Sequence, residues 1–185
     1  MTDLPTKAAL PLLQGERVQL RAYCDDDADA LYAIYSDPVV MRYWSFSPWS
    51  ERSQADDYLR RDRDYVGDGM LAWAIARRED DELVGTVTVL GINRAQGRAD
   101  IGYALSSAQW GKGIAQEAVR LALAHAFDVL QLRRIEADVD PRNTGSCRLL
   151  ERLGFTREGL LRERWKVSGE LQDSAIYGLL RGELK

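Results

Sequence analysis

A glycine-rich turn between an apolar run and an alanine-rich run constrains the fold of this chain more than any other stretch. Residues 101–105 are typical of a buried strand, and residues 113–130 are typical of a helix. Gly111 and Gly113 form the turn between them, where glycine lets the backbone approach a ligand closely. The free N–H groups and the dipole at the start of a helix attract an anion, and Lys112 adds a positive charge. The segment therefore predicts a phosphate-binding turn.

Two common phosphate-binding motifs do not fit this turn. A Walker A loop needs glycine five positions before its Gly-Lys pair and Ser or Thr after it, whereas this chain has Ser106 and Gly113 there. A dinucleotide fingerprint that starts at Gly111 would need a third glycine where Gln116 stands. Two interpretations stay open from these residues alone: a phosphate site of another kind, and a turn in which glycine serves the backbone geometry only.

A second segment, about thirty residues further on, favours the first interpretation. It begins with Asp140-Pro141-Arg142-Asn143 and continues as a short amphipathic helix that Gly154 closes. In this order and spacing, the two segments resemble the GNAT superfamily of acyl-CoA-dependent N-acyltransferases. Within that superfamily, the chain looks most like the Rim-type ribosomal-protein alanine N-acetyltransferases, and the resemblance extends from Arg17 to about Leu184.

The composition excludes several other classes of protein. A chain of 185 residues, of which 45% are apolar, can bury one core, and we expect a single domain over residues 1–185 with residues 1–15 as a loose N-terminal arm. A net charge of −4 argues against non-specific binding to nucleic acid, which needs a basic surface. Two cysteines and one histidine cannot form a Cys/His metal site, and the acidic residues 25–27 are expected to cap a helix. No 18-residue apolar run is present, so we expect no membrane partner. Together, these features lead us to expect a cytoplasmic protein without a nucleic-acid or metal partner, either a monomer or a homodimer.

Hydrophobic periodicity predicts about seven strands and four helices. The expected strands are residues 17–23, 71–77, 82–90, 98–105, 133–139, 158–167 and 171–180, and the expected helices are residues 25–35, 51–65, 113–130 and 143–153. The side chains of the long helix that are expected to face solvent are Gln116, Glu117, Arg120 and Asp128. The predicted fold class is α/β (α+β), with a central mixed, mostly antiparallel sheet flanked by helices on both faces. The resemblance to GNAT proteins implies the same fold.

The resemblance also implies that acetyl-CoA is the co-substrate. The main chain of the glycine turn would bind its pyrophosphate, through Trp110, Gly111, Lys112, Gly113, Ile114, Ala115 and Gln116. Ala104 and Leu105 would pair with the amides of the pantetheine arm, which Asn143 would also contact. Asn143 is equally typical of a helix N-cap. The family motif usually begins with Gln or Arg, and this chain departs from it with Trp110.

Transfer of an acyl group from a thioester to an amine needs an oriented donor, a neutral amine and a proton for the departing thiolate. Many GNAT enzymes have a tyrosine for that proton at the position of Leu150, and the resemblance to Rim-type proteins implies Ser146 instead. The alternative is that Ser146 only fills the first turn of its helix. Asp100 is the candidate base, on the same strand face as Gly102, although the sequence does not say what that face borders. His125, in the middle of a helix, is expected to be structural.

An aromatic cluster at residues 41–49 supplies the candidates for acceptor binding, which are Tyr43, Trp44 and Trp49. The alternative for these three is packing over the core, since aromatic side chains bury large apolar areas anywhere. The function that the sequence favours is transfer of an acetyl group to a primary amine, either a protein N-terminus or a small molecule. A CoA-binding domain without turnover and a plain nucleotide-binding protein are the alternatives.

Overall fold

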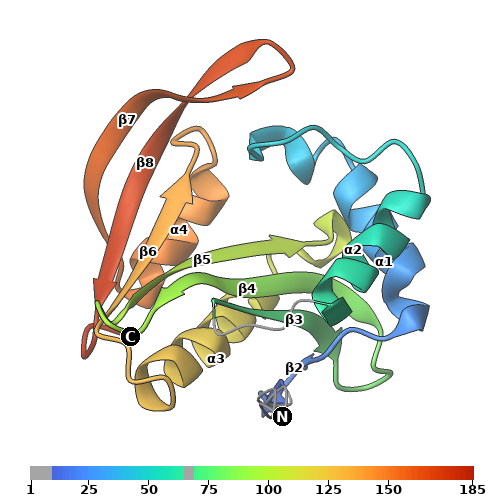
Figure 1. Ribbon diagram of the computed structural model, residues 1–185, viewed down its shortest axis with the longest axis horizontal. Coiled ribbons are helices and arrows are strands. Elements are labelled where there is room, and N and C mark those ends of the chain that lie inside the picture. Colours follow the sequence, from blue (N-terminus) through green and yellow to red (C-terminus); the bar gives the residue numbers. More distant parts are fainter. Residues whose placement is uncertain (1–9, 65–68) are drawn as a thin grey trace, which may run out of the picture.

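The computed structural model describes residues 10–64 and 69–185. In this part of the chain, eight strands form one sheet in the order β1-β2-β3-β4-β5-β6-β8-β7, with four α-helices around it (Figure 1). The strands are β1 (Leu13–Gln14), β2 (Val18–Arg21), β3 (Met70–Arg77), β4 (Leu83–Asn93), β5 (Arg98–Leu105), β6 (Arg134–Val139), β7 (Thr156–Val167) and β8 (Glu170–Leu180). The helices are α1 (Ala28–Ser36), α2 (Ser53–Asp64), α3 (Ile114–Asp128) and α4 (Thr144–Leu153). The predicted fold class is confirmed, because the described strand pairs are antiparallel except for β5 and β6.

The sheet separates two apolar cores. Side chains of α3 and α4 pack on one face against Trp73 and Ile75 of β3, whereas α1 and α2 pack against Ala74 on the opposite face. This division follows from the strand geometry, in which successive side chains point to opposite faces. The α1/α2 face and the α3/α4 face are therefore distinct, and a residue of β5 faces one or the other according to its position along the strand.

The N-terminal segment differs from the expectation of a loose arm at residues 1–15. Leu13 and Gln14 form β1, which pairs with β2, and the indole N–H of Trp73 donates to the carbonyl oxygen of Pro11 at 2.9 Å. Leu10 also packs against the core of the α3/α4 face. A two-residue strand is too short to give a periodic pattern, which is why the sequence did not reveal it. Residues 1–9 lie outside the described residues.

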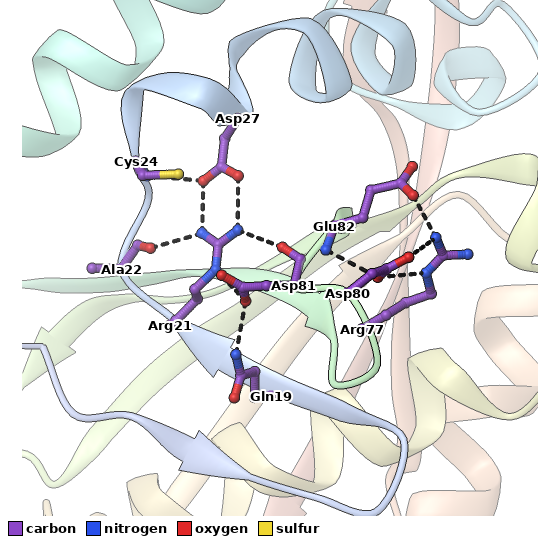
Figure 2. Close-up of polar contacts among 9 residues, drawn as sticks. All are labelled: Gln19, Arg21, Ala22, Cys24, Asp27, Arg77, Asp80, Asp81 and Glu82. Atoms are coloured by element: carbon purple, nitrogen blue, oxygen red, sulfur yellow. Dashed lines mark hydrogen bonds and ion pairs between the residues drawn. The ribbon is translucent and has the colours of Figure 1, made fainter.

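Figure 2 shows the polar contacts that connect the end of β2 to the start of α1 and to the turn between β3 and β4. Arg21 donates to both carboxylate oxygens of buried Asp27 at 2.8 Å and to Asp81 at 2.9 Å. Burial alone raises the pKa of Asp27, but hydrogen bonds from Arg21 and from the main chain of Cys24 outweigh it and hold the pKa below its usual value. The acidic run at residues 25–27 thus anchors the fold, and the described residues contain no cluster of acidic, histidine and cysteine side chains that could hold a metal ion.

The strands β5 and β6 separate soon after they begin (Figure 1). They pair in parallel only from Arg98 to Asp100 of β5, and residues 101–105 have no registered partner on β6 in the part of the chain that the structure describes. The hairpin of β7 and β8 extends beyond the body and curves toward the loop between α1 and α2 (Figure 1). At its tip, the hydroxyl of Ser168 lies 2.9 Å from the hydroxyl of Ser47 in that loop.

Candidate active site

The glycine turn has the backbone geometry that an anion site requires. Gly111 and Gly113 adopt φ angles of 75° and 76°, in the left-handed region that side chains disfavour. Gly113 is the N-cap of α3, and the N–H of Glu117 is bonded to the Gly113 carbonyl oxygen at 3.1 Å. The N–H groups of the first helical turn, at residues 114–116, therefore have no partners within the helix. Trp110 steadies the turn, since its indole N–H donates to the carbonyl oxygen of Leu105 at 3.0 Å.

An ion pair holds this turn from the N-terminal side. Nε of Arg17 lies 2.8 Å from the Glu117 carboxylate, and Nη1 of Arg17 donates to the Lys112 carbonyl oxygen at 2.6 Å. Burial raises the pKa of Glu117, but hydrogen bonds from Arg17 and from the Val18 main chain outweigh burial and place the pKa below its usual value. The prediction that Glu117 faces solvent is wrong, because its side chain is only 15% exposed.

The main chain of β5 alternates between its two neighbours. The Gly97 carbonyl oxygen accepts from the Arg133 N–H on the β6 side, whereas the Ser106 N–H donates to Val84 of β4. Even-numbered residues therefore face β4, and a Cβ added at Gly85 of β4 would collide with the carbonyl oxygen of Ala104. The main-chain N–H and carbonyl groups on the unpaired side of β5 belong to the odd-numbered residues. Those of Tyr103 and the Leu105 N–H therefore lie on that side, whereas the main-chain groups of Ala104 face β4.

Ser146, the candidate acid, lies opposite this unpaired stretch. Asn143 caps α4 by accepting a hydrogen bond from the Ser146 N–H at 3.1 Å, as an N-cap residue does. The hydroxyls of Ser146 and Tyr103 lie 2.6 Å apart, so a hydrogen bond spans the space between α4 and β5. Burial raises the pKa of Tyr103, which keeps its hydroxyl protonated. Leu150 is fully buried in the core, whereas the Ser146 hydroxyl makes the hydrogen bond from this helix to β5.

Asp100, the candidate base, lies on the other face of β5 from the Tyr103 side chain. It shares that face with Ala104, which packs into the core of α1 and α2. Burial first, then the nearby charges of Glu136 and Asp138, raise the pKa of the Asp100 carboxyl. Asp100 and Glu136 are the last residues in the parallel pairing, so the carboxylate stands where the two strands separate. The two candidate catalytic groups thus lie on opposite faces of the sheet, beside the same stretch of β5 that does not pair with β6.

This environment of Asp100 predicts that Asp100→Asn stabilises the protein at neutral pH. A raised carboxyl pKa means that the folded state binds the proton more tightly, so ionisation lowers stability as the pH rises from the usual value of 3.8 through the raised pKa. Amide substitution removes that loss. Urea unfolding should give a gain for the variant at pH 7 that disappears below the usual pKa, whereas Glu79→Gln, at an exposed turn, should show no such trend. A gain independent of pH would contradict this account.

The three aromatic candidates for acceptor binding have different surroundings. Trp49 stacks on Tyr35 of α1 with ring centroids 4.6 Å apart, and Trp44 meets the same ring edge-on at 5.6 Å. Both are partly buried and pack against the core of the α1/α2 face, in agreement with the packing alternative. Tyr43 is different, because the guanidinium of Arg142 lies 5.8 Å from its ring centroid.

Arg142 joins three segments that are far apart in the sequence. It lies in the turn between β6 and α4, bonds the buried carboxylate of Asp140 and forms an ion pair with Glu170 of the hairpin at 2.7 Å. Its guanidinium also faces Tyr43 of the loop between α1 and α2. Together with the contact of Ser47 and Ser168, these interactions bring the loop and the hairpin together beside the α1/α2 face. His125 lies elsewhere, on α3, where it packs edge-on against Trp73.

Residues 17–156 match the acetyltransferase (GNAT) domain family. The chain belongs to the GNAT family. It is 41% identical over 172 residues to the uncharacterized N-acetyltransferase p20 of Bacillus licheniformis, with 92% of this chain and 97% of the relative covered. It is 27% identical over 157 residues to spermidine N(1)-acetyltransferase of Escherichia coli K12, with 85% and 82% covered. Mycobacterium smegmatis RimJ in complex with CoA-disulfide superposes with a TM-score of 0.81 and 29% identity over 95% of this chain and 90% of that chain.

Membership of this family makes the chain an acetyl-CoA-dependent N-acetyltransferase that acts on an amine. None of the described helices is long and apolar enough to cross a bilayer. Three residues around the candidate site were not singled out from the sequence: Arg17, Tyr103 and Glu170. Each is an ordinary polar or aromatic residue in its local pattern, and only contacts with distant segments distinguish it.

Proposed function

We propose that this acetyltransferase acts on a small cationic primary amine, with Asp100 as general base and Ser146 as general acid. The observation that carries the proposal is the unpaired stretch of β5, which ends at the glycine turn and has the two candidate groups on its opposite faces. A donor arriving from the α3/α4 face and an amine arriving from the α1/α2 face would meet at this stretch. The arrangement supplies the orientation that acyl transfer requires.

The main chain offers a continuous set of partners for acetyl-CoA. The pyrophosphate would bind the turn, through the N–H groups of Gly111, Lys112, Gly113, Ile114, Ala115 and Gln116. The Trp110 N–H is not available for this role, because it donates to the Ser107 carbonyl oxygen at 3.2 Å. The pantetheine amides would pair with the unpaired edge of β5, where Tyr103 and Leu105 present main-chain groups. Ala104 is replaced by Tyr103 in this role, because its main chain faces β4. Asn143 would lie beside the arm from α4, while its side chain also caps that helix.

The chemistry then needs two protons to leave the acceptor nitrogen and one proton to reach the departing sulfur. Asp100 would take a proton from the ammonium form of the acceptor, and the neutral nitrogen would attack the thioester carbon. As the C–S bond breaks, the Ser146 hydroxyl would donate to the departing sulfur, while the Tyr103 hydroxyl, 2.6 Å away, donates to Ser146. Its raised pKa keeps Tyr103 protonated and so available as that donor. The nitrogen, which carries an extra proton after the attack, releases it to solvent, and Asp100 also returns its proton to solvent. Solvent in turn restores the proton that the pair of Ser146 and Tyr103 gives up.

Two features favour a small cationic acceptor over a peptide. The carboxylate of Asp100 lies where β5 and β6 separate and would attract a positively charged amine, whereas the neighbouring Glu136 carboxylate is already paired with Arg134 at 2.7 Å. The contacts of Ser47 with Ser168 and of Tyr43 with Arg142 join the loop to the hairpin, which narrows the approach for an extended peptide. A protein N-terminal amine, as in Rim-type enzymes, is the second candidate, supported by the likeness to RimJ. Tyr43 would contact either acceptor, with Trp44 and Trp49 behind it.

Thiol release from acetyl-CoA tests this proposal directly. We expect turnover with a panel of polyamines or aminoglycosides and a kcat/KM at least about tenfold higher than with peptides that begin with alanine or serine, a difference of about 1.4 kcal/mol in transition-state stabilisation. Turnover of the peptides alone would favour the second candidate. If CoA binds but no amine accelerates thiol release, the chain is a CoA-binding domain without turnover. Tight binding of ATP without binding of CoA would instead indicate a nucleotide-binding protein.

A further inference from the structure

We infer that Arg17 is a positioning residue of the glycine turn, which it holds so that the Gly113 N–H faces the pyrophosphate of the donor. The inference rests on the proposed placement of acetyl-CoA at this turn. Arg17 immediately precedes β2, 95 residues before Lys112, and yet its guanidinium contacts the turn itself.

The direction of the Gly113 N–H follows from the hydrogen bond that Arg17 makes. Nη1 of Arg17 donates to the Lys112 carbonyl oxygen at 2.6 Å. In a planar trans peptide, the carbonyl and the following N–H point in opposite directions. The peptide between Lys112 and Gly113 is trans, so its N–H points away from the guanidinium. The Arg17 guanidinium therefore lies on one side of the turn, and the Gly113 N–H points to the opposite side, where a ligand can bind.

Arg17 is itself held in place, which it must be to orient anything else. Its main-chain N–H donates to Oε1 of Glu117 at 2.9 Å, and its Nε donates to Oε2 of the same carboxylate at 2.8 Å. The Val18 N–H adds a third contact to Oε1 at 3.3 Å. A planar guanidinium can bond a carboxylate and a carbonyl at once with fixed geometry, which the single ammonium of lysine cannot do. The Arg17 side chain thus connects the first turn of α3 to the glycine turn.

The glycine turn depends on this support because its residues are conformationally free. Gly111 and Gly113 both have positive φ angles, and glycine has many other backbone conformations available. A Cβ added at Gly113 would lie 3.2 Å from both Nη1 and Nη2 of Arg17, so the guanidinium packs directly against this residue. Loss of the arginine removes the hydrogen bond to the Lys112 carbonyl oxygen and opens space beside Gly113. We expect the peptide to reorient in part of the population, which lowers affinity for the pyrophosphate alone.

The test compares two acetyl donors in Arg17→Gln. With acetyl-CoA and an acceptor that the wild type uses, we expect KM to rise about tenfold and kcat to stay within twofold. With S-acetylpantetheine, which has no pyrophosphate, kcat/KM should stay within twofold of the wild type. Arg78→Gln is the matched control, because Arg78 bonds the Gly15 carbonyl oxygen in the same N-terminal segment and has no recorded contact with the turn among the described residues.

Three results would overturn or separate the inferences. Equal loss with both donors would mean that Arg17 has a general structural role, and unchanged affinity for CoA in a folded variant would mean that it has none at the turn. Failure of the wild type to bind CoA would instead refute the proposed donor site. Should Arg17→Gln not fold, as judged by thermal unfolding, Arg17→Lys decides: it keeps the charge but not the double contact, and a threefold to tenfold higher KM for acetyl-CoA is expected.

Discussion

Replacement of Gly113 by aspartate will weaken the binding of acetyl-CoA by at least about a hundredfold, which corresponds to about 2.7 kcal/mol. Three effects act together at this position. A φ of 76° is unfavourable for any residue with a Cβ, the new side chain would press on the Arg17 guanidinium, and a carboxylate would repel the pyrophosphate at the start of α3. Isothermal titration of acetyl-CoA into the wild type and the variant measures the loss.

The matched control is Gly182→Asp. Gly182 also has a positive φ, 97°, and no atoms lie near its added Cβ, so the control repeats the charge and the backbone cost far from the turn. We expect it to bind acetyl-CoA as the wild type does. Gly113→Ala separates the charge from the strain and should lose about tenfold, since it lacks the carboxylate. If Gly113→Asp folds and binds acetyl-CoA within threefold of the wild type, the pyrophosphate does not lie at this turn.

Local pattern was sufficient to predict most of the fold. Strong alternation and apolar runs located seven of the strands, and the 3.6-residue period located the four helices. The short strand β1 escaped because two residues carry no period, and Glu117 was misplaced because helical periodicity assigns it to the outer face. Its actual partner, Arg17, comes from a segment 100 residues earlier. A partly buried carboxylate of this kind depends on tertiary packing, which no local window contains.

The candidate site likewise has one part that the local sequence predicts and another that depends on tertiary packing. The glycine turn is a local motif, and its left-handed residues are where the sequence placed them. The pairing of Tyr103 with Ser146 is not local, because it arises only where β5 and β6 separate. A tyrosine in an apolar strand is indistinguishable from a core residue by pattern alone. Likewise, the alternation of side chains can be predicted from the sequence, but the strand that each main-chain group faces cannot. For this reason the sequence predicts the pairing with pantetheine for Ala104, whereas we propose it for Tyr103.

The proposed role of Ser146 and Tyr103 leads to the second large expected effect. Ser146→Ala should lower kcat by about a hundredfold, the lower end of the range for loss of general acid–base catalysis, and leave the KM for acetyl-CoA within threefold. The helix should survive, because Asn143 caps it through the main-chain N–H of residue 146, which alanine retains. Thr144→Ala, an exposed position in the same helical turn, is the control and should keep wild-type kcat.

Tyr103→Phe distinguishes a catalytic pair from a lone serine. If Tyr103 donates to Ser146 during the reaction, its loss should lower kcat about tenfold, and the double variant should be no slower than Ser146→Ala alone, because two groups that act through one proton path are not additive. Additive losses would mean that the two hydroxyls act independently. A Ser146→Ala variant that keeps more than half of the wild-type kcat would remove Ser146 from the mechanism and leave solvent as the proton source for the thiolate.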